Sequence, residues 1–315
     1  MSALRIVFMG TPELAAASLA ALLHTPDLQV AAVATQPDRP KGRDLKLHPS
    51  PVKQTALAAG LPVFQPEKAR EETFIEQLRQ LQPDLIAVAA YGQILPRSIL
   101  DLPRLGCINV HTSLLPKYRG AAPIQWAILN GDTESGVTIM KIDLALDSGD
   151  ILSQRSVPIG PADTGQVLHD RLAAVGAQLL VETIPDYAAG RITPHPQPAE
   201  GVSYARKIRK EDGRIDWQQP ARTIVNRLRA FTPWPGVFAF RAAQPRPQLL
   251  KIWEAEVVTT TGKPGEILSA DTTGLVVGCG MDALRITILQ CENSRRMTTR
   301  EFLAGHPIKP GEMLA

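Results

Sequence analysis

The opening residues hold the pattern that most constrains the fold of this chain. Residues 4–9 (LRIVFM) are a continuous apolar run, which is typical of a strand buried on both faces of a parallel sheet. Residues 10–12 (GTP) suit a turn into a helix, because Thr can cap the first turn and Pro fits its first position. Leucines and alanines continue that helix, and a second apolar strand follows at residues 29–35. This strand–helix–strand order predicts an α/β domain with a doubly wound sheet.

The chain is long enough for two domains. Its 315 residues exceed one average domain. Residues 191–205 are rich in proline, which indicates a linker. Beyond them, apolar segments separated by glycines and polar turns predict a small, OB-like β-barrel, with strands at residues 237–240, 249–258, 265–268, 274–278 and 284–289. We therefore expect a catalytic domain at residues 1–190, a linker at 191–205 and a barrel domain at 206–315.

Charged residues are divided unevenly between these parts. Residues 1–205 hold 17 Lys and Arg against 20 Asp and Glu, whereas residues 206–315 hold 17 against 11. A basic second part favours contact with a polyanion, although a solvated basic surface has the same composition. No apolar run reaches the length of about 18 residues that a membrane span needs. Three scattered cysteines are too few for a disulfide framework, so we expect a cytoplasmic location. We also expect a monomer that does not bind membranes.

A second basic feature lies at residues 36–51 (QPDRPKGRDLKLHPSP). This segment predicts a long loop, and its cationic residues are Arg39, Lys41, Arg43 and Lys46. Long loops in compact domains are often functional. Beside an active site, this loop would suit contact with phosphate groups; the alternative is a mobile surface loop.

Polar residues gather in the middle of the chain, where two predicted strands end. Residues 107–110 form an apolar run that contains Asn109 and is followed by His111, and side-chain alternation places these two on one face. Asp147 follows the next strand, at residues 136–141. If the two strands are neighbours, the Asp147 carboxylate would face His111, raise the histidine pKa and orient the ring. The alternative for Asp147 is a turn residue that caps backbone amides.

Other kinds of active site lack their signatures in this sequence. Gly10 stands alone in the first turn instead of G-x-G-x-x-G, which counts against a nicotinamide dehydrogenase. The chain has no G-x-S-x-G elbow, Walker loop or H-E-x-x-H, and its histidines show no metal-ligand spacing. We therefore expect hydrogen-bond and acid–base chemistry without a metal or a covalent intermediate. A non-catalytic RNA-binding barrel with a scaffold domain is the alternative from another class.

The residues around the polar group resemble a known family. Residues 109–116 (NVHTSLLP), 118–120 (YRG) and 147–150 (DSGD) are similar to the signature of folate-dependent formyltransferases. The stretches MGTPELAA, TQPDRPKGR, SPVK, AYGQILP, RIDW and AFTPWPG resemble the members of this family that act on methionyl-tRNA. The resemblance covers nearly the whole chain. It implies a Rossmann-like formyltransferase domain followed by a small β-barrel.

This resemblance also implies a reaction. The formyl donor would be 10-formyltetrahydrofolate, and the acceptor would be the free amino group of methionyl initiator tRNA. Asn109 would bind the formyl oxygen, protonated His111 would stabilise the charge that develops on it, and Asp147 would orient His111 and help to move protons. A small-molecule amine as acceptor is the alternative within the family.

Two groups of binding residues follow from the same resemblance. The folate site would be lined by Ser113, Leu114, Leu115 and Pro116. The tRNA would be held by the basic barrel and by the loop residues Arg39, Lys41, Arg43 and Lys46, through phosphate contacts that supply affinity more than sequence information.

Overall fold

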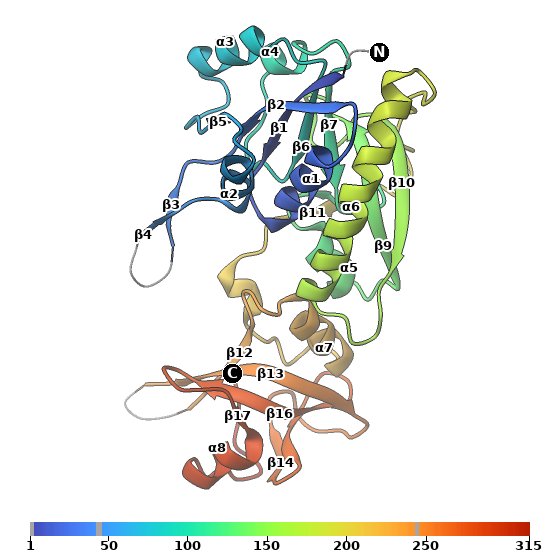
Figure 1. Cartoon of the computed structure of the whole chain (residues 1–315). Helices are drawn as coiled ribbons and strands as arrows, with labels where there is room; N and C mark the ends of the chain where they lie inside the picture. The colour runs from blue at the N-terminus through green and yellow to red at the C-terminus, as the bar shows by residue number, and fades with distance from the viewer. Residues whose placement is uncertain (1–2, 42–45, 243–245) are drawn as a thin grey trace. The chain divides into compact units, whose positions relative to one another are not determined.

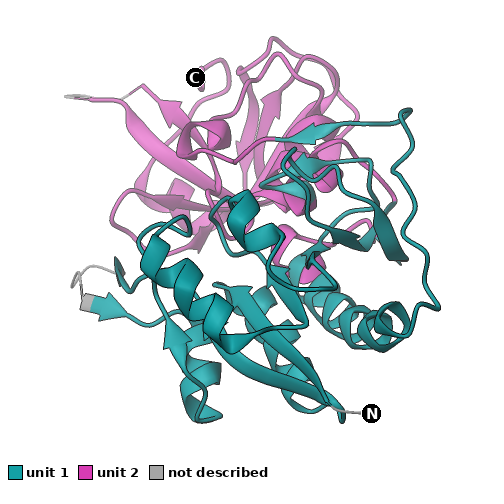
Figure 2. Ribbon diagram, turned by 90° about the horizontal axis from the view of Figure 1, so that it is seen from above, with its two compact units in different colours: residues 1–123, 134–158, 169–205 teal, residues 124–133, 159–168, 206–315 magenta. Residues whose placement is uncertain are grey.

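The chain folds into two compact units. The computed structural model describes residues 3–41, 46–242 and 246–315 (Figure 1). Unit 1 consists of Met1–Pro123, Glu134–Pro158 and His169–Ala205, and unit 2 consists of Ile124–Thr133, Ile159–Leu168 and Arg206–Ala315 (Figure 2). The segment expected to be a linker, residues 191–205, therefore belongs to unit 1. The expected division into domains at 1–190 and 206–315 stays a prediction about independent folding.

Unit 1 is built on a seven-stranded mixed sheet with the order β10-β9-β7-β6-β1-β2-β5. Its first five strands along the chain pair in parallel, as the apolar runs predict. Strand β9 runs antiparallel to its neighbour β7. Strand β10 pairs antiparallel with β9, because the short connection between these two strands favours a hairpin. The strands are β1 (Leu4–Gly10), β2 (Leu28–Ala34), β5 (Val63–Phe64), β6 (Leu85–Ala89), β7 (Cys107–His111), β9 (Glu134–Lys141) and β10 (Ile151–Pro158). This Rossmann-like sheet confirms the predicted fold class.

Helices cover both faces of this sheet. One face packs against α3 (Glu72–Leu81) and α4 (Arg97–Leu100), whose apolar residues form a core cluster that includes Cys107 of β7. The other face is covered by α1 (Glu13–Leu23) and α6 (Gly165–Ala188) (Figure 1). Gly176 allows α6 to approach β7, since a Cβ there would lie only 2.9 Å from Val110. Helix α2 (Pro51–Ala58) also belongs to unit 1, whereas α5 (Pro123–Leu129) falls in unit 2 from Ile124 onwards.

The position of each residue along β7 determines whether its side chain packs in the core or lies at the ligand-binding end of the sheet. Cys107, Asn109 and His111 point to the same side of the sheet, because side chains alternate along a strand. Cys107 lies in the core cluster with α3 and α4, whereas Asn109 and His111 lie beyond that cluster, at the carboxyl end of the strand. Ligands of open α/β sheets bind at this end of the strands.

The basic segment at residues 36–51 is a hairpin rather than an irregular loop. Strands β3 (Arg39–Lys41) and β4 (Lys46–His48) pair antiparallel, with Arg39 opposite His48. The base of the hairpin is held by Asp38, whose carboxylate accepts hydrogen bonds from Lys53 (2.6 Å) and Gln65 (2.8 Å). The sequence does not predict this pairing, because strands are usually recognised by alternating apolar residues and this segment is rich in charged residues and proline. Arg43 lies outside the described residues.

Unit 2 contains an antiparallel sheet with the order β12-β13-β16-β15-β14, and β17 pairs with β16. The strands are β12 (Val237–Arg241), β13 (Gln248–Val258), β14 (Ile267–Asp271), β15 (Gly274–Gly278), β16 (Ala283–Cys291) and β17 (Met297–Thr298). Its helices are η1 (Lys210–Gly213), α7 (Ala221–Ala230) and α8 (Thr299–Gly305). An antiparallel β domain in this part of the chain confirms the predicted architecture.

The last residues of the chain close this sheet into a ring. Ala315 exchanges two backbone hydrogen bonds with Phe240 of β12 (2.7 and 2.8 Å). On the other side, Leu314 donates to Gly265 (2.8 Å), and Ile267 of β14 donates to Glu312 (2.9 Å). Residues 311–315 thus lie between the first and last strands of the sheet and remove both open edges.

Two further observations concern the part of the chain that the structure describes. No helix in it is long and apolar enough to cross a membrane. Its three cysteines, Cys107, Cys279 and Cys291, are buried and unpaired.

Candidate active site

His111 ends β7 as an almost fully buried imidazole. Its Nε2 lies 3.0 Å from the backbone oxygen of Tyr118. Since a carbonyl can only accept, Nε2 carries the proton, and Nδ1 is left for other partners. Burial lowers the pKa of His111 below its ordinary value, although the Asp147 carboxylate and the Tyr118 carbonyl act in the opposite direction. Burial therefore outweighs the carboxylate effect expected from the sequence, and the resting ring is neutral near pH 7.

Asp147 faces this ring from the loop between β9 and β10. One carboxylate oxygen, Oδ2, lies 3.7 Å from Nδ1 of His111. The same oxygen accepts a hydrogen bond from the backbone N–H of Gly120 (2.8 Å). Two strands bring the pair together, because β7 and β9 are neighbours with His111 opposite Thr138. Asp147 is thus both the partner of His111 and the acceptor of a backbone amide.

Asn109 lies two residues before His111 on the same side of β7. Its backbone is fixed in the sheet between Val88 and Met140, and its side chain is partly exposed. Within the described ranges, its carboxamide makes no hydrogen bond to protein. The amide is therefore free to bind a ligand.

The four residues expected to line the folate site follow His111 closely and differ in their exposure to solvent. Ser113 and Leu115 are buried and bonded internally: the Ser113 hydroxyl donates to Lys117 (2.6 Å), and the Leu115 amide donates to Thr138 (3.1 Å). Leu114 and Pro116 are partly exposed. Of the four, these two have side-chain surface available for a ligand.

Four residues near the site were missed by sequence reasoning or noted only as part of a motif. Tyr118 and Gly120 act through the backbone carbonyl and amide that hold His111 and Asp147. Arg119, between them, donates two hydrogen bonds to Gln197, whose amide donates to the Asp147 loop. The YRG motif is a sequence signal for the first three. Gln197 lies in the proline-rich segment and has no such signal.

Three of the four cations expected to bind tRNA, Arg39, Lys41 and Lys46, lie in the described part of the hairpin. Arg39 is exposed and lies 3.5 Å from Glu67, which is also exposed. Lys41 and Lys46 occupy paired positions in β3 and β4. Exposed ion pairs of the Arg39–Glu67 kind are weak, so Arg39 can exchange its partner for a phosphate group.

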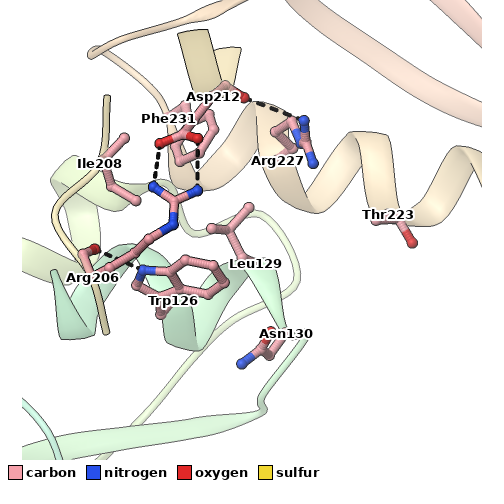
Figure 3. Close-up of a pocket in the computed structure, with 9 residues that line it drawn as sticks. All are labelled: Trp126, Leu129, Asn130, Arg206, Ile208, Asp212, Thr223, Arg227 and Phe231. Atoms are coloured by element: carbon pink, nitrogen blue, oxygen red, sulfur yellow. Dashed lines mark hydrogen bonds and ion pairs between the residues drawn. The ribbon is translucent and has the colours of Figure 1, made fainter. Parts of the chain in front are cut away.

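A pocket lies within unit 2, lined by residues of α5, α7 and the segment around η1 (Figure 3). Arg206 lies over the Trp126 ring and donates two hydrogen bonds to Asp212 (2.8 and 2.7 Å). Hydrogen bonds from Arg206 lower the pKa of Asp212 to about 2. Because these charges satisfy each other, the pocket offers no acid–base group for catalysis. Across the described residues, no cluster of His, Cys, Asp or Glu could hold a metal ion.

Comparison with protein families matches both parts of the chain. Residues 4–184 match the Formyl transferase family, and residues 207–307 match the family described as Formyl transferase, C-terminal domain. The first match covers more than half of the chain and contains Asn109, His111 and Asp147.

Individual proteins give the same result more specifically. The chain is 52% identical to the methionyl-tRNA formyltransferase of Aromatoleum aromaticum over 309 residues, which are 98% of this chain and 96% of that protein. It is 48% identical to the methionyl-tRNA formyltransferase of Geobacter metallireducens over 311 residues, 99% of this chain and 98% of that protein.

Solved structures share the fold at much lower identity. The sugar 3N-formyltransferase WlaRD superposes with a TM-score of 0.65 at 19% identity, over 93% of this chain and 99% of that one. HypX from Aquifex aeolicus with tetrahydrofolic acid has a TM-score of 0.60 at 19% identity, over 100% of this chain and 51% of that one.

Proposed function

The chain belongs to the methionyl-tRNA formyltransferases, and on this premise we propose that Asn109, His111 and Asp147 carry out the formyl transfer. The protein is a folate-dependent enzyme that moves a formyl group from 10-formyltetrahydrofolate to the amino group of methionyl-tRNA. The observation that supports the three residues best is their geometry. A free amide and a buried imidazole with a facing carboxylate lie together at the carboxyl end of β7.

The first requirement of the reaction is to stabilise negative charge on the formyl oxygen. Attack by the amino group converts the planar formyl carbon into a tetrahedral one, and its oxygen becomes an anion. The Asn109 carboxamide has free N–H groups on the side of the sheet that carries His111. A preorganised donor of this kind is worth roughly 10²–10³-fold in rate when it is aimed at a developing oxyanion.

The second requirement is to move one proton from the attacking amine to the departing folate nitrogen. In its resting neutral form, His111 carries a hydrogen on Nε2 that it donates to Tyr118, and its Nδ1 can accept a proton. The imidazolium formed in this way is stabilised by the Asp147 carboxylate at 3.7 Å. It then returns the proton to the folate nitrogen as the carbon–nitrogen bond of the donor breaks. Protonated His111 is thus an intermediate species and not the resting form.

Several finer features belong to the same proposal. Leu114 and Pro116 contact the folate, while Ser113 and Leu115 shape the turn beneath it. Arg39, Lys41, Arg43 and Lys46 contact phosphates of the initiator tRNA near its acceptor end, and basic residues of unit 2 contact its backbone. One candidate group in unit 2 is Trp253 with Lys251 and Arg296, because both cations lie over its ring and make no ion pair with a described residue. We also propose that the enzyme acts as a cytoplasmic monomer.

A direct assay tests the function. The purified protein is mixed with 10-formyltetrahydrofolate and methionyl initiator tRNA, and formylmethionyl product is measured after hydrolysis of the ester bond. We expect product with this acceptor and none with a free sugar amine. Formylation of the sugar amine without formylation of the tRNA would contradict the assignment.

A further inference from the structure

Gln197 makes an unusual set of contacts beside the candidate active site. Its Nε2 donates to two backbone carbonyls of the loop that carries the proposed catalytic carboxylate, Asp147 (2.8 Å) and Gly149 (2.9 Å). Its Oε1 accepts two hydrogen bonds from Arg119, from Nε (3.1 Å) and Nη2 (2.7 Å). Both hydrogens of the amide nitrogen and both lone pairs of the oxygen are used.

The chemistry of these partners fixes the orientation of the Gln197 amide. Carbonyls can only accept hydrogen bonds and a guanidinium can only donate them. A flipped amide would therefore turn its oxygen to two carbonyls and its nitrogen to Arg119, and lose all four bonds. Gln197 has one orientation, and so it transmits the position of Arg119 to the Asp147 loop.

The loop needs such support. Asp147 has a left-handed backbone with φ of 47°, an uncommon conformation for residues other than glycine that Asp adopts when local hydrogen bonds support it. Leu144 and Leu146, in the same loop, have exposed fractions of 62% and 61% and give it little packing. The hydrogen bonds from Gln197 lie at Asp147 itself and two residues beyond it, where they hold this conformation.

Arg119, which donates to Oε1 of Gln197, is also connected through its neighbour Gly120 to the Asp147 carboxylate. Arg119 precedes Gly120, whose backbone amide donates to Oδ2 of Asp147. Arg119 and Gly120 form β8, which pairs in parallel with β11 (Tyr204–Ala205). The proline-rich segment is itself fixed to the sheet, because His195 exchanges two backbone hydrogen bonds with Ile151. The ring Asp147–Gly120–Arg119–Gln197–Asp147 is thus closed and anchored at both sides.

We propose that Gln197 is a positioning residue, whose carboxamide holds the Asp147 loop against Arg119 so that the carboxylate faces His111. Segment 191–205 then helps to position a catalytic residue and does more than connect two parts of the chain. This inference rests on the role proposed above for Asp147. It predicts that changes at Gln197 alter the chemical step more than the binding of either substrate.

The central test replaces Gln197 by Met, which has a similar size and no charge and removes all four hydrogen bonds. We expect kcat to fall about 10–100-fold, the loss that a displaced catalytic group causes, while KM for the folate and for methionyl-tRNA changes less than about threefold. Gln178→Met is the matched control, since Gln178 is an exposed glutamine of α6 bonded to Glu182. A kcat for Gln197→Met within about twofold of the wild-type value would overturn the proposal, as would a loss confined to KM.

A double-mutant cycle with Asp147→Asn shows whether Gln197 acts through this carboxylate. Rates are measured in single turnovers with excess enzyme, so that slow variants remain measurable. We expect Gln197→Met to slow the wild-type enzyme but to change the Asp147→Asn rate by less than about twofold. Equal losses in both backgrounds would show that Gln197 acts elsewhere and would overturn the inference alone. An Asp147→Asn enzyme with wild-type activity would overturn the proposed function as well.

Two further variants keep the proposal testable if Gln197→Met fails to fold. Gln197→Glu retains the size and the acceptor for Arg119 but removes both donors to the loop, so we expect a loss of kcat similar to that of Gln197→Met. Arg119→Met leaves these donors in place, and we expect a smaller loss. The reverse order would overturn the proposal, because the donor end of Gln197 holds Asp147 directly.

Discussion

The Asp147 oxygen that lies 3.7 Å from Nδ1 of His111 is the same oxygen that accepts the amide hydrogen of Gly120. In the neutral ring Nδ1 carries no hydrogen, because the proton lies on Nε2 facing the Tyr118 carbonyl, so no hydrogen bond joins Nδ1 to this oxygen. The carboxylate is therefore held at a distance from which it stabilises a positive imidazole by its charge, without binding the neutral ring tightly. This arrangement suits a histidine that becomes protonated only during the reaction.

Removal of either member of this pair should slow the reaction strongly. We expect His111→Ala and Asp147→Asn to lower kcat by roughly 10²–10⁴-fold, the usual contribution of a positioned acid–base group. Asp143→Asn is the control, because Asp143 is exposed and its carboxylate accepts a hydrogen bond from the backbone N–H of its neighbour Leu144. Thermal unfolding of each variant shows that the fold is retained. Wild-type rates in both His111→Ala and Asp147→Asn would refute the site.

The lowered pKa of His111 makes the stability of the protein depend on pH. In the unfolded chain the imidazole takes up a proton below about pH 6.5, whereas the buried ring of the folded protein stays neutral to lower pH. Stability is therefore complete above that pH and is lost as the pH falls towards the lowered pKa. We expect His111 to contribute a slope of up to about 1.4 kcal/mol per pH unit there.

Urea unfolding between about pH 4.5 and 7 tests this slope. The His111→Gln variant should show a shallower loss of stability on acidification than the wild type, because Gln does not titrate. Parallel curves for the two proteins would mean that the folded ring is protonated as readily as the unfolded one.

Gly149 should resist substitution because of its close packing. A Cβ at this position would overlap the backbone oxygen of Lys141, which belongs to β9. We expect Gly149→Ala to lower the free energy of unfolding by about 1–3 kcal/mol and to reduce kcat by displacing Asp147. Gly305→Ala is the control, since nothing lies within 4 Å of its Cβ position. Denaturant unfolding and steady-state kinetics of the two variants provide the comparison, and equal stabilities would contradict the expected clash.

Closure of the β domain by the chain end makes Leu314 important for stability. Its side chain has an exposed fraction of 3%, whereas that of Met313 beside it is 50% exposed. We expect Leu314→Ala to lower the free energy of unfolding by about 2–5 kcal/mol, and Met313→Ala to cost much less. Urea unfolding monitored by tryptophan fluorescence measures both. A larger effect at Met313 would argue against the closed ring.

The cations of the β3–β4 hairpin should bind tRNA through phosphates. We expect the combined change of Arg39, Lys41 and Lys46 to Gln to weaken tRNA binding without affecting folate binding. The slope of log Kd against log salt should fall by about one for each phosphate that the variant no longer neutralises. Arg79→Gln on α3 is the control, because Arg79 is exposed and pairs with Glu76 in its own helix. An unchanged salt slope would exclude the hairpin from the tRNA contact.

Much of the fold could be predicted because its signals are local. The apolar run at β1, the turn at Gly10 and the leucines of α1 each act within a few residues, and they define the start of a parallel sheet. Period-two alternation likewise placed Asn109 and His111 on one face of β7. The hairpin β3–β4 was not recognised, because its residues are polar and its pairing is the only regular feature of the segment.

The sequence by itself determined which chemical groups are present and which of them share a strand. Only the tertiary structure decided that β9 lies beside β7, so that Asp147 faces His111 across the sheet. It also decided that burial lowers the His111 pKa, although the adjacent carboxylate alone would raise it. Gln197 lies 50 residues beyond Asp147 along the chain, and its role follows from four hydrogen bonds that no local pattern encodes. These features depend on desolvation and on contacts between distant residues, and both arise only when the chain is packed.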